Sequence, residues 1–133
     1  EKLGERVVME VRGPLSLYGT MLGREIDPEE VKKTISLVTR FPEYQFRTTV
    51  SPVVREGEPA ETSYLTPDEV AETAKLIQEL TGSFKQPYVL RTFDQESASD
   101  ERLKSVGKLT SNDLLRHRSA ARKFQVQTEI EKS

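Results

Sequence analysis

The stretch that decides the fold is residues 44–52, YQFRTTVSP. Aromatic and β-branched residues alternate in it with polar ones, and this period of two predicts a strand that ends before Pro52. Arg47 lies in the middle of that strand, where a guanidinium needs an anionic partner because it cannot lose its charge. Two roles stay open for Arg47: contact with a ligand on an inner sheet face, or an ion pair with a carboxylate on the outer face.

Further sequence signals predict helices, strands and loops on both sides of this strand. Helix start signals occur at Asp27-Pro28, at the capping box that begins with Thr66, and at Thr110. The third helix is expected to place Leu114, Leu115, Ala121 and Phe124 on its apolar side. Further strands are predicted at residues 6–12, 88–93 and 126–130, and loops at residues 15–26, 53–65 and 94–108.

Strands and helices therefore alternate along the chain, which predicts an α/β fold of parallel β/α repeats with right-handed crossovers. The long loops follow the strands, as in folds whose sites lie at the carboxyl ends of their strands. Four strands do not close a β/α barrel, which needs eight strands and about 250 residues. We expect either an open sheet or about half of a larger barrel, with the first strand at an edge.

Composition narrows the class of protein. The chain has 133 residues, a net charge of −2, and 20 basic and 22 acidic residues that are interspersed. We expect a single soluble, cytoplasmic domain over residues 1–133, with no nucleic-acid or membrane partner. The chain has no cysteine, so disulfides, thiolate metal sites and iron–sulfur ligation by its own residues are excluded.

Few residues stand out as chemical candidates. Glu10 and Arg12 are two apart in the first strand and share a face near its carboxyl end. Either they contact a ligand or they form an ion pair with Arg47 or Arg91. His117 lies between two arginines in a predicted helix, so we expect it to face solvent. No phosphate loop, catalytic triad or metal-ligand spacing is evident, and the residues themselves predict no catalytic residue and no metal site.

The order of segments resembles the C-terminal half of radical S-adenosylmethionine activating enzymes. The matching stretches are VVMEVRGPLSLYGTMLG at 7–23, YQFRTTVSP at 44–52, LTPDEV at 65–70 and PYVLRTF at 87–93. The chain is most similar to the activating enzymes of anaerobic ribonucleotide reductase and of pyruvate formate-lyase. The resemblance implies half of a partial, TIM-like β/α barrel. In the family, a CxxxCxxC loop holds a [4Fe–4S] cluster, and S-adenosylmethionine is cleaved to a 5′-deoxyadenosyl radical that acts on a glycyl-radical enzyme.

The resemblance also implies cofactor-binding residues. Glu10 stands where the family usually has aspartate, and Arg12 where it has lysine, on the strand that reaches the ribose and methionine portions of the cofactor. Arg47 matches the family's arginine on the next strand, near the cofactor. Phe93 and Asp94 fall where a later strand approaches the adenine. Glu for Asp and Arg for Lys keep the charge but lengthen both side chains, and Arg does not replace Lys neutrally.

The cysteine loop and the glycine-rich methionine-binding motif are absent from this sequence. The resemblance therefore implies a C-terminal fragment of a longer enzyme, inactive alone, with S-adenosylmethionine and the cluster held only in the full-length parent. Its expected partners are a glycyl-radical enzyme and a second copy that pairs through the open sheet edge. Two alternatives remain: another radical S-adenosylmethionine enzyme acting on a small molecule or nucleoside, and a non-catalytic β/α interaction module.

Overall fold

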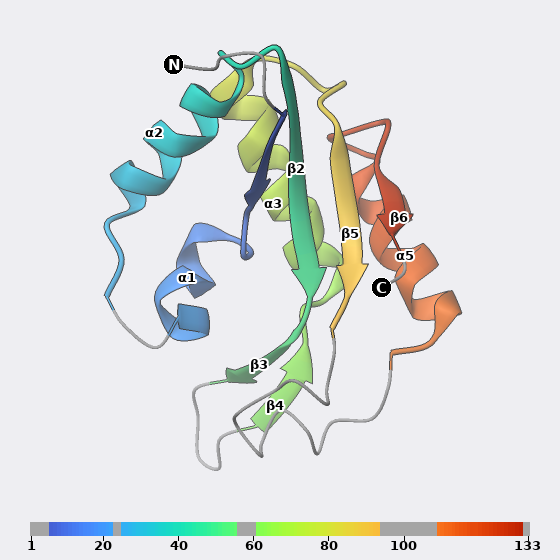
Figure 1. The fold of residues 1–133 in the computed structure, drawn as a ribbon. Coiled ribbons are helices and arrows are strands. Elements are labelled where there is room, and N and C mark those ends of the chain that lie inside the picture. The colour runs from blue at the N-terminus through green and yellow to red at the C-terminus, as the bar shows by residue number, and fades with distance from the viewer. Residues whose placement is uncertain (1–5, 23–24, 56–60, 94–108, 132–133) are drawn as a thin grey trace.

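The fold is built on a parallel sheet of four strands in the order β1-β2-β5-β6 (Figure 1). The computed structural model describes residues 6–22, 25–55, 61–93 and 109–131. Neighbouring strands of this sheet follow one another along the chain, without the reversal of order found in doubly wound sheets. The prediction of an α/β fold with a parallel sheet is confirmed. The strands are β1 (Arg6–Glu10), β2 (Glu43–Val50), β5 (Tyr88–Thr92) and β6 (Glu129–Glu131).

Three helices connect these strands and form one layer: α2 (Pro28–Val38), α3 (Pro67–Thr81) and α5 (Ser111–Ala121). α3 packs between α2 and α5, and Figure 1 shows α3 behind β2 and β5. The buried stripes of these helices meet Phe46, Thr48 and Val50 of β2 and Tyr88 and Leu90 of β5. The helix side of the sheet is thus the hydrophobic core, where a fully buried large apolar side chain is worth about 1.5–3 kcal/mol.

The helices begin where the sequence predicts. Asp27, Thr66 and Thr110 are the N-caps, and the last two form capping boxes with Glu69 and Asp113. Each cap satisfies backbone N–H groups that the helix leaves unpaired, which is worth about 1 kcal/mol. Gly82 ends α3 in a left-handed conformation (φ 73°) that favours glycine.

The segment after β1 is not a loop, contrary to the prediction. Residues Leu15–Leu22 form the helix α1, which starts directly after Pro14 with a bond from the Leu17 N–H to the Pro14 carbonyl oxygen (2.9 Å). Tyr18 is buried on the inner side of this helix. Gly19 obscured the helical pattern, because a glycine inside a helix costs about 1 kcal/mol relative to alanine.

The segment after β2 also differs from the predicted loop. It contains an antiparallel hairpin of β3 (Pro52–Arg55) and β4 (Glu61–Tyr64), which lies beyond the carboxyl ends of the sheet strands (Figure 1). Side-chain hydrogen bonds hold this hairpin, which no period-two pattern marks in the sequence. Arg55 Nε donates to Ser63 Oγ (3.1 Å), and Arg55 Nη2 donates to the Tyr64 carbonyl oxygen (2.9 Å). The loop predicted at residues 94–108 lies outside the described residues.

The last strand and the last helix need smaller corrections. β6 begins at Glu129 rather than Val126, because the preceding residues turn, with Thr128 N–H and Oγ1 both donating to the Gln125 carbonyl oxygen. Leu115 of α5 is exposed, so it does not belong to the apolar side of that helix. Leu114 and Ala121 are buried as predicted.

His117 is buried, with an exposed fraction of 4%, although the sequence suggests a solvent-facing residue. Its Nδ1 lies 2.7 Å from the Asp113 carbonyl oxygen and its Nε2 lies 2.6 Å from the Leu65 carbonyl oxygen. The second contact joins α5 to the junction that precedes α3. Carbonyl oxygens only accept, so the ring donates to both only when each nitrogen carries a proton.

Replacing His117 tests this link. We expect His117→Leu, which keeps a similar volume, to lower the free energy of unfolding by about 1–3 kcal/mol, because the Leu65 carbonyl oxygen is left buried without its donor. Urea denaturation followed by circular dichroism measures the change. The control is Ser119→Ala on the exposed side of α5. Equal stabilities of the two variants would contradict the role of His117.

Glu69 ties α3 to the hairpin. Its carboxylate forms a two-point ion pair with Arg55 and accepts the Thr66 N–H at 2.8 Å. Burial raises the pKa of Glu69, but the hydrogen bonds from Arg55 and Thr66 outweigh burial and hold this pKa below its ordinary value. A carboxyl group with a lowered pKa stabilises the fold above its unfolded pKa, and this contribution is lost as the pH falls through the lowered value.

The stability contributed by Glu69 should therefore depend on pH. At neutral pH we expect the free energy of unfolding of Glu69→Gln to be about 1 kcal/mol lower than that of the wild type. The difference should shrink as the pH falls from about 4.5 toward full protonation, because the wild-type carboxyl then becomes neutral as well. Urea titrations at several pH values measure this, with exposed Glu72→Gln as the control. A difference that stays constant over that range would refute the assignment.

Candidate functional site

The candidate site is the sheet face opposite the helices. Side chains alternate along β2, so Arg47 and Thr49 lie on the face opposite buried Phe46, Thr48 and Val50. Strand register places Glu10 beside Arg47 and Arg91 beside Thr49. Glu131 pairs with Arg91 from β6. This face is therefore charged, and within the described residues no helix covers it (Figure 1).

Glu10 ends the pairing of β1 with β2. Its Oε2 accepts the backbone N–H of Thr49 at 2.8 Å, after the last main-chain bond from Val11 N–H to the Arg47 carbonyl oxygen (2.7 Å). The Val11 carbonyl oxygen is taken by Thr48 Oγ1 at 2.7 Å. Two side chains thus satisfy the backbone groups where the strands separate. The Glu10 carboxylate is held at the carboxyl end of β1.

Tyr18 of α1 packs against the same strand end. Its hydroxyl accepts the Arg12 N–H at 3.2 Å and donates to the Glu10 carbonyl oxygen at 3.5 Å. Burial raises the pKa of Tyr18 above its ordinary value, so the phenol stays neutral and can donate this bond. α1 therefore fixes the backbone that carries Glu10 and Arg12.

Arg47 and Arg91 share one carboxylate. Arg47 Nη2 lies 3.9 Å from Glu131 Oε2, and Arg91 Nε lies 3.4 Å from Glu131 Oε1. The Nε atoms of both arginines are buried and have no hydrogen-bond partner. Of the two roles considered for Arg47, the structure shows the ion pair with a carboxylate, on the sheet face opposite the helices; contact with a ligand stays a prediction.

The structure brings two of the predicted residues together. Glu10, the last residue of β1, lies beside Arg47 in the middle of β2, and Arg12 follows β1 by two residues. The ion pair expected between Glu10 and Arg47 or Arg91 is not present among the described residues, because Glu10 binds a backbone N–H instead. Phe93 follows β5 directly and is partly buried. Asp94 lies outside the described residues.

Tyr18, Thr49 and Glu131 also belong to this site, although sequence reasoning did not select them. Thr49 is in the central strand, but only its backbone acts. Glu131 follows the predicted end of the last strand by one residue, so the pattern gave no reason to choose it. Tyr18 was assigned to a covering loop; the bulky residue near a strand end was the available signal.

The described part of the chain contains no group of three or more His, Cys, Asp and Glu side chains that could hold a metal ion. In the same described segments, none of the helices combines the length and the apolar character needed to cross a membrane. Carboxylate and guanidinium groups are present on the sheet face, and they bind hydroxyl and oxyanion groups respectively.

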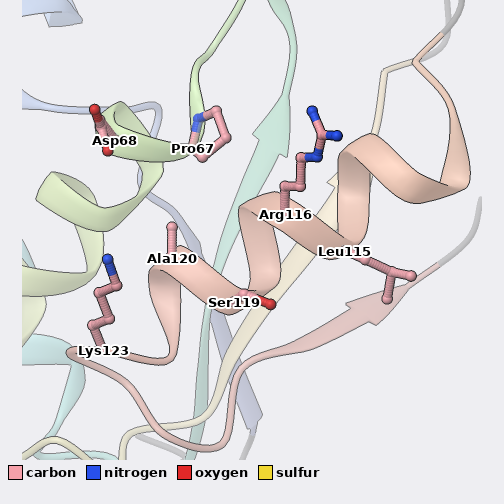
Figure 2. A pocket seen from close by; sticks show the side chains of 7 residues that line it. All are labelled: Pro67, Asp68, Leu115, Arg116, Ser119, Ala120 and Lys123. Carbon is pink, nitrogen blue, oxygen red and sulfur yellow. The ribbon is translucent and has the colours of Figure 1, made fainter.

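A second hollow lies on the opposite side of the molecule, between the start of α3 and α5 (Figure 2). Its volume is about 380 Å³. Exposed Leu115 and Arg116 come from α5, Lys123 follows the end of that helix, and Asp68 comes from α3. This groove shares no residue with the charged sheet face, so the two surfaces can be tested separately.

Comparisons with protein-family models, curated proteins and solved structures found no match for this chain. The function is therefore inferred from the geometry of the charged sheet face and from the resemblance of the sequence. These two lines of support are independent, because the contacts at the strand ends do not depend on the resemblance.

The contact between Glu10 and Thr49 can be tested by hydrogen exchange. Glu10→Ala removes the acceptor, so we expect the Thr49 amide to exchange about tenfold faster, which corresponds to about 1.4 kcal/mol of lost protection. Glu10→Gln retains an acceptor oxygen and should restore most of the protection. Glu43→Ala, at the exposed start of β2, is the control. Unchanged exchange at Thr49 in Glu10→Ala would show that the bond is not formed in solution.

Proposed function

We propose that this chain is part of a radical S-adenosylmethionine activating enzyme and supplies one wall of its cofactor pocket. The observation that carries the proposal is that Glu10, at the carboxyl end of β1, lies beside Arg47 of β2 on a sheet face without a helix layer, with Arg12 two residues beyond the end of β1. Ligand sites of parallel α/β folds lie at the carboxyl ends of the strands. These three residues are among the five that the resemblance relates to the cofactor.

The strand order supports a place within a partial β/α barrel. Successive strands are neighbours and their helices form one layer, which is the arrangement of a barrel wall, with its inner face toward the ligand. β1 is at one edge of the described sheet. An edge strand needs a partner for its backbone groups. We propose that the remaining strands of the parent barrel pair there; a second copy of the chain is the alternative.

The residues present fit S-adenosylmethionine. Glu10 Oε1 has no hydrogen-bond partner among the described residues, and a carboxylate oxygen is a strong acceptor for ribose hydroxyls. The guanidinium of Arg47 is only partly paired and is suited to the methionine carboxylate. The backbone bond to Thr49 holds Glu10 in place before any ligand binds, which reduces the entropic cost of binding.

An iron–sulfur cluster does not fit this chain's own residues. Its usual ligands are cysteine thiolates, and the sequence contains no cysteine. We therefore assign the cluster to residues outside this sequence. The cofactor would supply the radical chemistry in the parent enzyme, and the residues described here would bind and orient it. A glycyl-radical enzyme is the partner that this function implies.

A non-catalytic interaction module is the second candidate, and the groove between α3 and α5 favours it. Exposed Leu115 and the cationic side chains of Arg116 and Lys123 line this groove (Figure 2), a combination suited to an acidic, partly apolar segment of a partner. A radical enzyme acting on a small molecule or nucleoside would use the sheet face instead. Anaerobic purification of the product of the whole encoding gene separates these classes, because the enzyme readings require iron–sulfur absorption in the visible range and the module does not.

Titration of the isotope-labelled chain with S-adenosylmethionine tests the cofactor site. We expect amide shifts at residues 9–12 and 47–49, and weaker shifts with methylthioadenosine, which lacks the amino acid portion. Arg47→Gln should weaken S-adenosylmethionine binding by about tenfold or more, because a hydrogen bond between charged groups is worth about 1.5–3 kcal/mol.

Arg40→Gln, an exposed position after α2, provides the matched control. Shifts confined to the groove between α3 and α5 would favour the interaction module. No shifts at the strand ends, or an equal loss of affinity in Arg40→Gln and Arg47→Gln, would remove the support for a cofactor site.

A further inference from the structure

Arg91 is the second arginine of the charged sheet face, and the resemblance assigns it no role. It lies on β5 opposite Thr49, two positions nearer the carboxyl end than Val89, the residue opposite Arg47. Its side chain and that of Arg47 are mostly covered, with exposed fractions of 32% and 23%. Both approach the carboxylate of Glu131 from neighbouring strands. Arg91 therefore extends the site from β2 to β5.

The charges of this cluster do not balance. Arg47 and Arg91 carry two positive charges that neither can lose, and Glu131 supplies one negative charge to both. The carboxylate of Glu10 is bonded to the Thr49 N–H and forms no ion pair with either arginine. Arg12, exposed at the same edge, adds another positive charge. The three arginines thus exceed the two carboxylates, including the still negative Glu10, by one positive charge.

The hydrogen bonds of the cluster are also incomplete. The closest approaches of Arg47 and Arg91 to Glu131, 3.9 and 3.4 Å, are ion-pair contacts without hydrogen-bond geometry. The Nε atoms of both arginines are buried and have no acceptor. Buried guanidinium donors call for an oxygen acceptor, and the planar fork of arginine matches carboxylate and phosphate groups.

We propose that Arg91 and the Nη2 side of Arg47 form an oxyanion subsite that binds a carboxylate or phosphate group of the substrate, with the Glu131 carboxylate occupying that place until the ligand displaces it and the other N–H donors of Arg47 remaining for the cofactor. That the ligand is a substrate rests on the proposed function, whereas oxyanion binding by the two arginines does not. Glu131 is suited to displacement because 44% of its side chain is exposed and β6 is the edge strand. Its rotation away from the arginines breaks only the two long contacts described above.

The test is a titration of the isotope-labelled chain with inorganic phosphate, and separately with acetate, at constant ionic strength maintained with chloride. The Nε–H resonances of Arg47 and Arg91 report binding directly. We expect both to shift, and Arg91→Gln to weaken binding by about tenfold, the effect of losing one charge-assisted hydrogen bond. Glu131→Gln should strengthen binding by about two- to fivefold, since it removes the competing carboxylate of a partly exposed pair.

Arg122→Gln is the matched control. Arg122 also pairs with a glutamate, Glu129, but its Nε already donates to the Thr128 carbonyl oxygen at 2.9 Å. Circular dichroism verifies that each variant is folded. Arg91→Lys keeps the positive charge but lacks the planar guanidinium, so it separates the effect of charge from the effect of guanidinium geometry. A response to phosphate alone or to acetate alone identifies the ligand class.

No shift at either Nε–H, or an equal loss of binding in Arg122→Gln, would overturn the oxyanion subsite. The cofactor assignment is tested independently of this result. Arg91→Gln should leave the S-adenosylmethionine shifts at residues 9–12 in place, whereas failure of the cofactor assignment removes those shifts from the wild type and leaves the phosphate response intact.

Discussion

A buried chain of hydrogen bonds through Thr48 holds the three central segments of the fold together. The Tyr88 hydroxyl donates to Thr48 Oγ1 at 2.7 Å, and Thr48 Oγ1 donates to the Val11 carbonyl oxygen at 2.7 Å. All three residues are at most 1% exposed. Burial raises the pKa of Tyr88, so its hydroxyl remains a donor. In an apolar core, each of these groups would be costly without its partner.

This chain of bonds determines how β1 leaves the sheet. Because Thr48 takes the Val11 carbonyl oxygen on the helix side, the Thr49 N–H is left for the Glu10 carboxylate on the opposite side. The two faces of β2 thus have different roles where β1 ends. One face completes the hydrophobic core, and the other positions the charged side chain of Glu10. The proposed cofactor contacts depend on this separation of β1 from β2.

Because the helices pack on one side of the sheet, the charged side chains of β2 and β5 lie on the other side. The core takes the apolar residues of β2 and β5, which leaves Arg47 and Arg91 on the other face with a single shared carboxylate. Such a surface is unfavourable unless solvent, a ligand or further protein supplies acceptors. This difference between the two sheet faces supports both the barrel proposal and the oxyanion subsite, because further protein or a bound anion would supply the hydrogen-bond acceptors that the described face lacks.

The sequence by itself determined the order of the four sheet strands and their three connecting helices, the helix caps and the parallel class of the sheet, because periodicity, capping boxes and crossover rules are local or topological. It also selected Glu10, Arg12 and Arg47. Only the tertiary structure decided that His117 is buried, that Glu10 bonds a backbone N–H and that Arg47, Arg91 and Glu131 share one cluster. Those outcomes depend on contacts between residues that are 39 or more positions apart, such as Thr49 with Glu10 and His117 with Leu65, and no local pattern encodes which groups the fold brings within bonding distance.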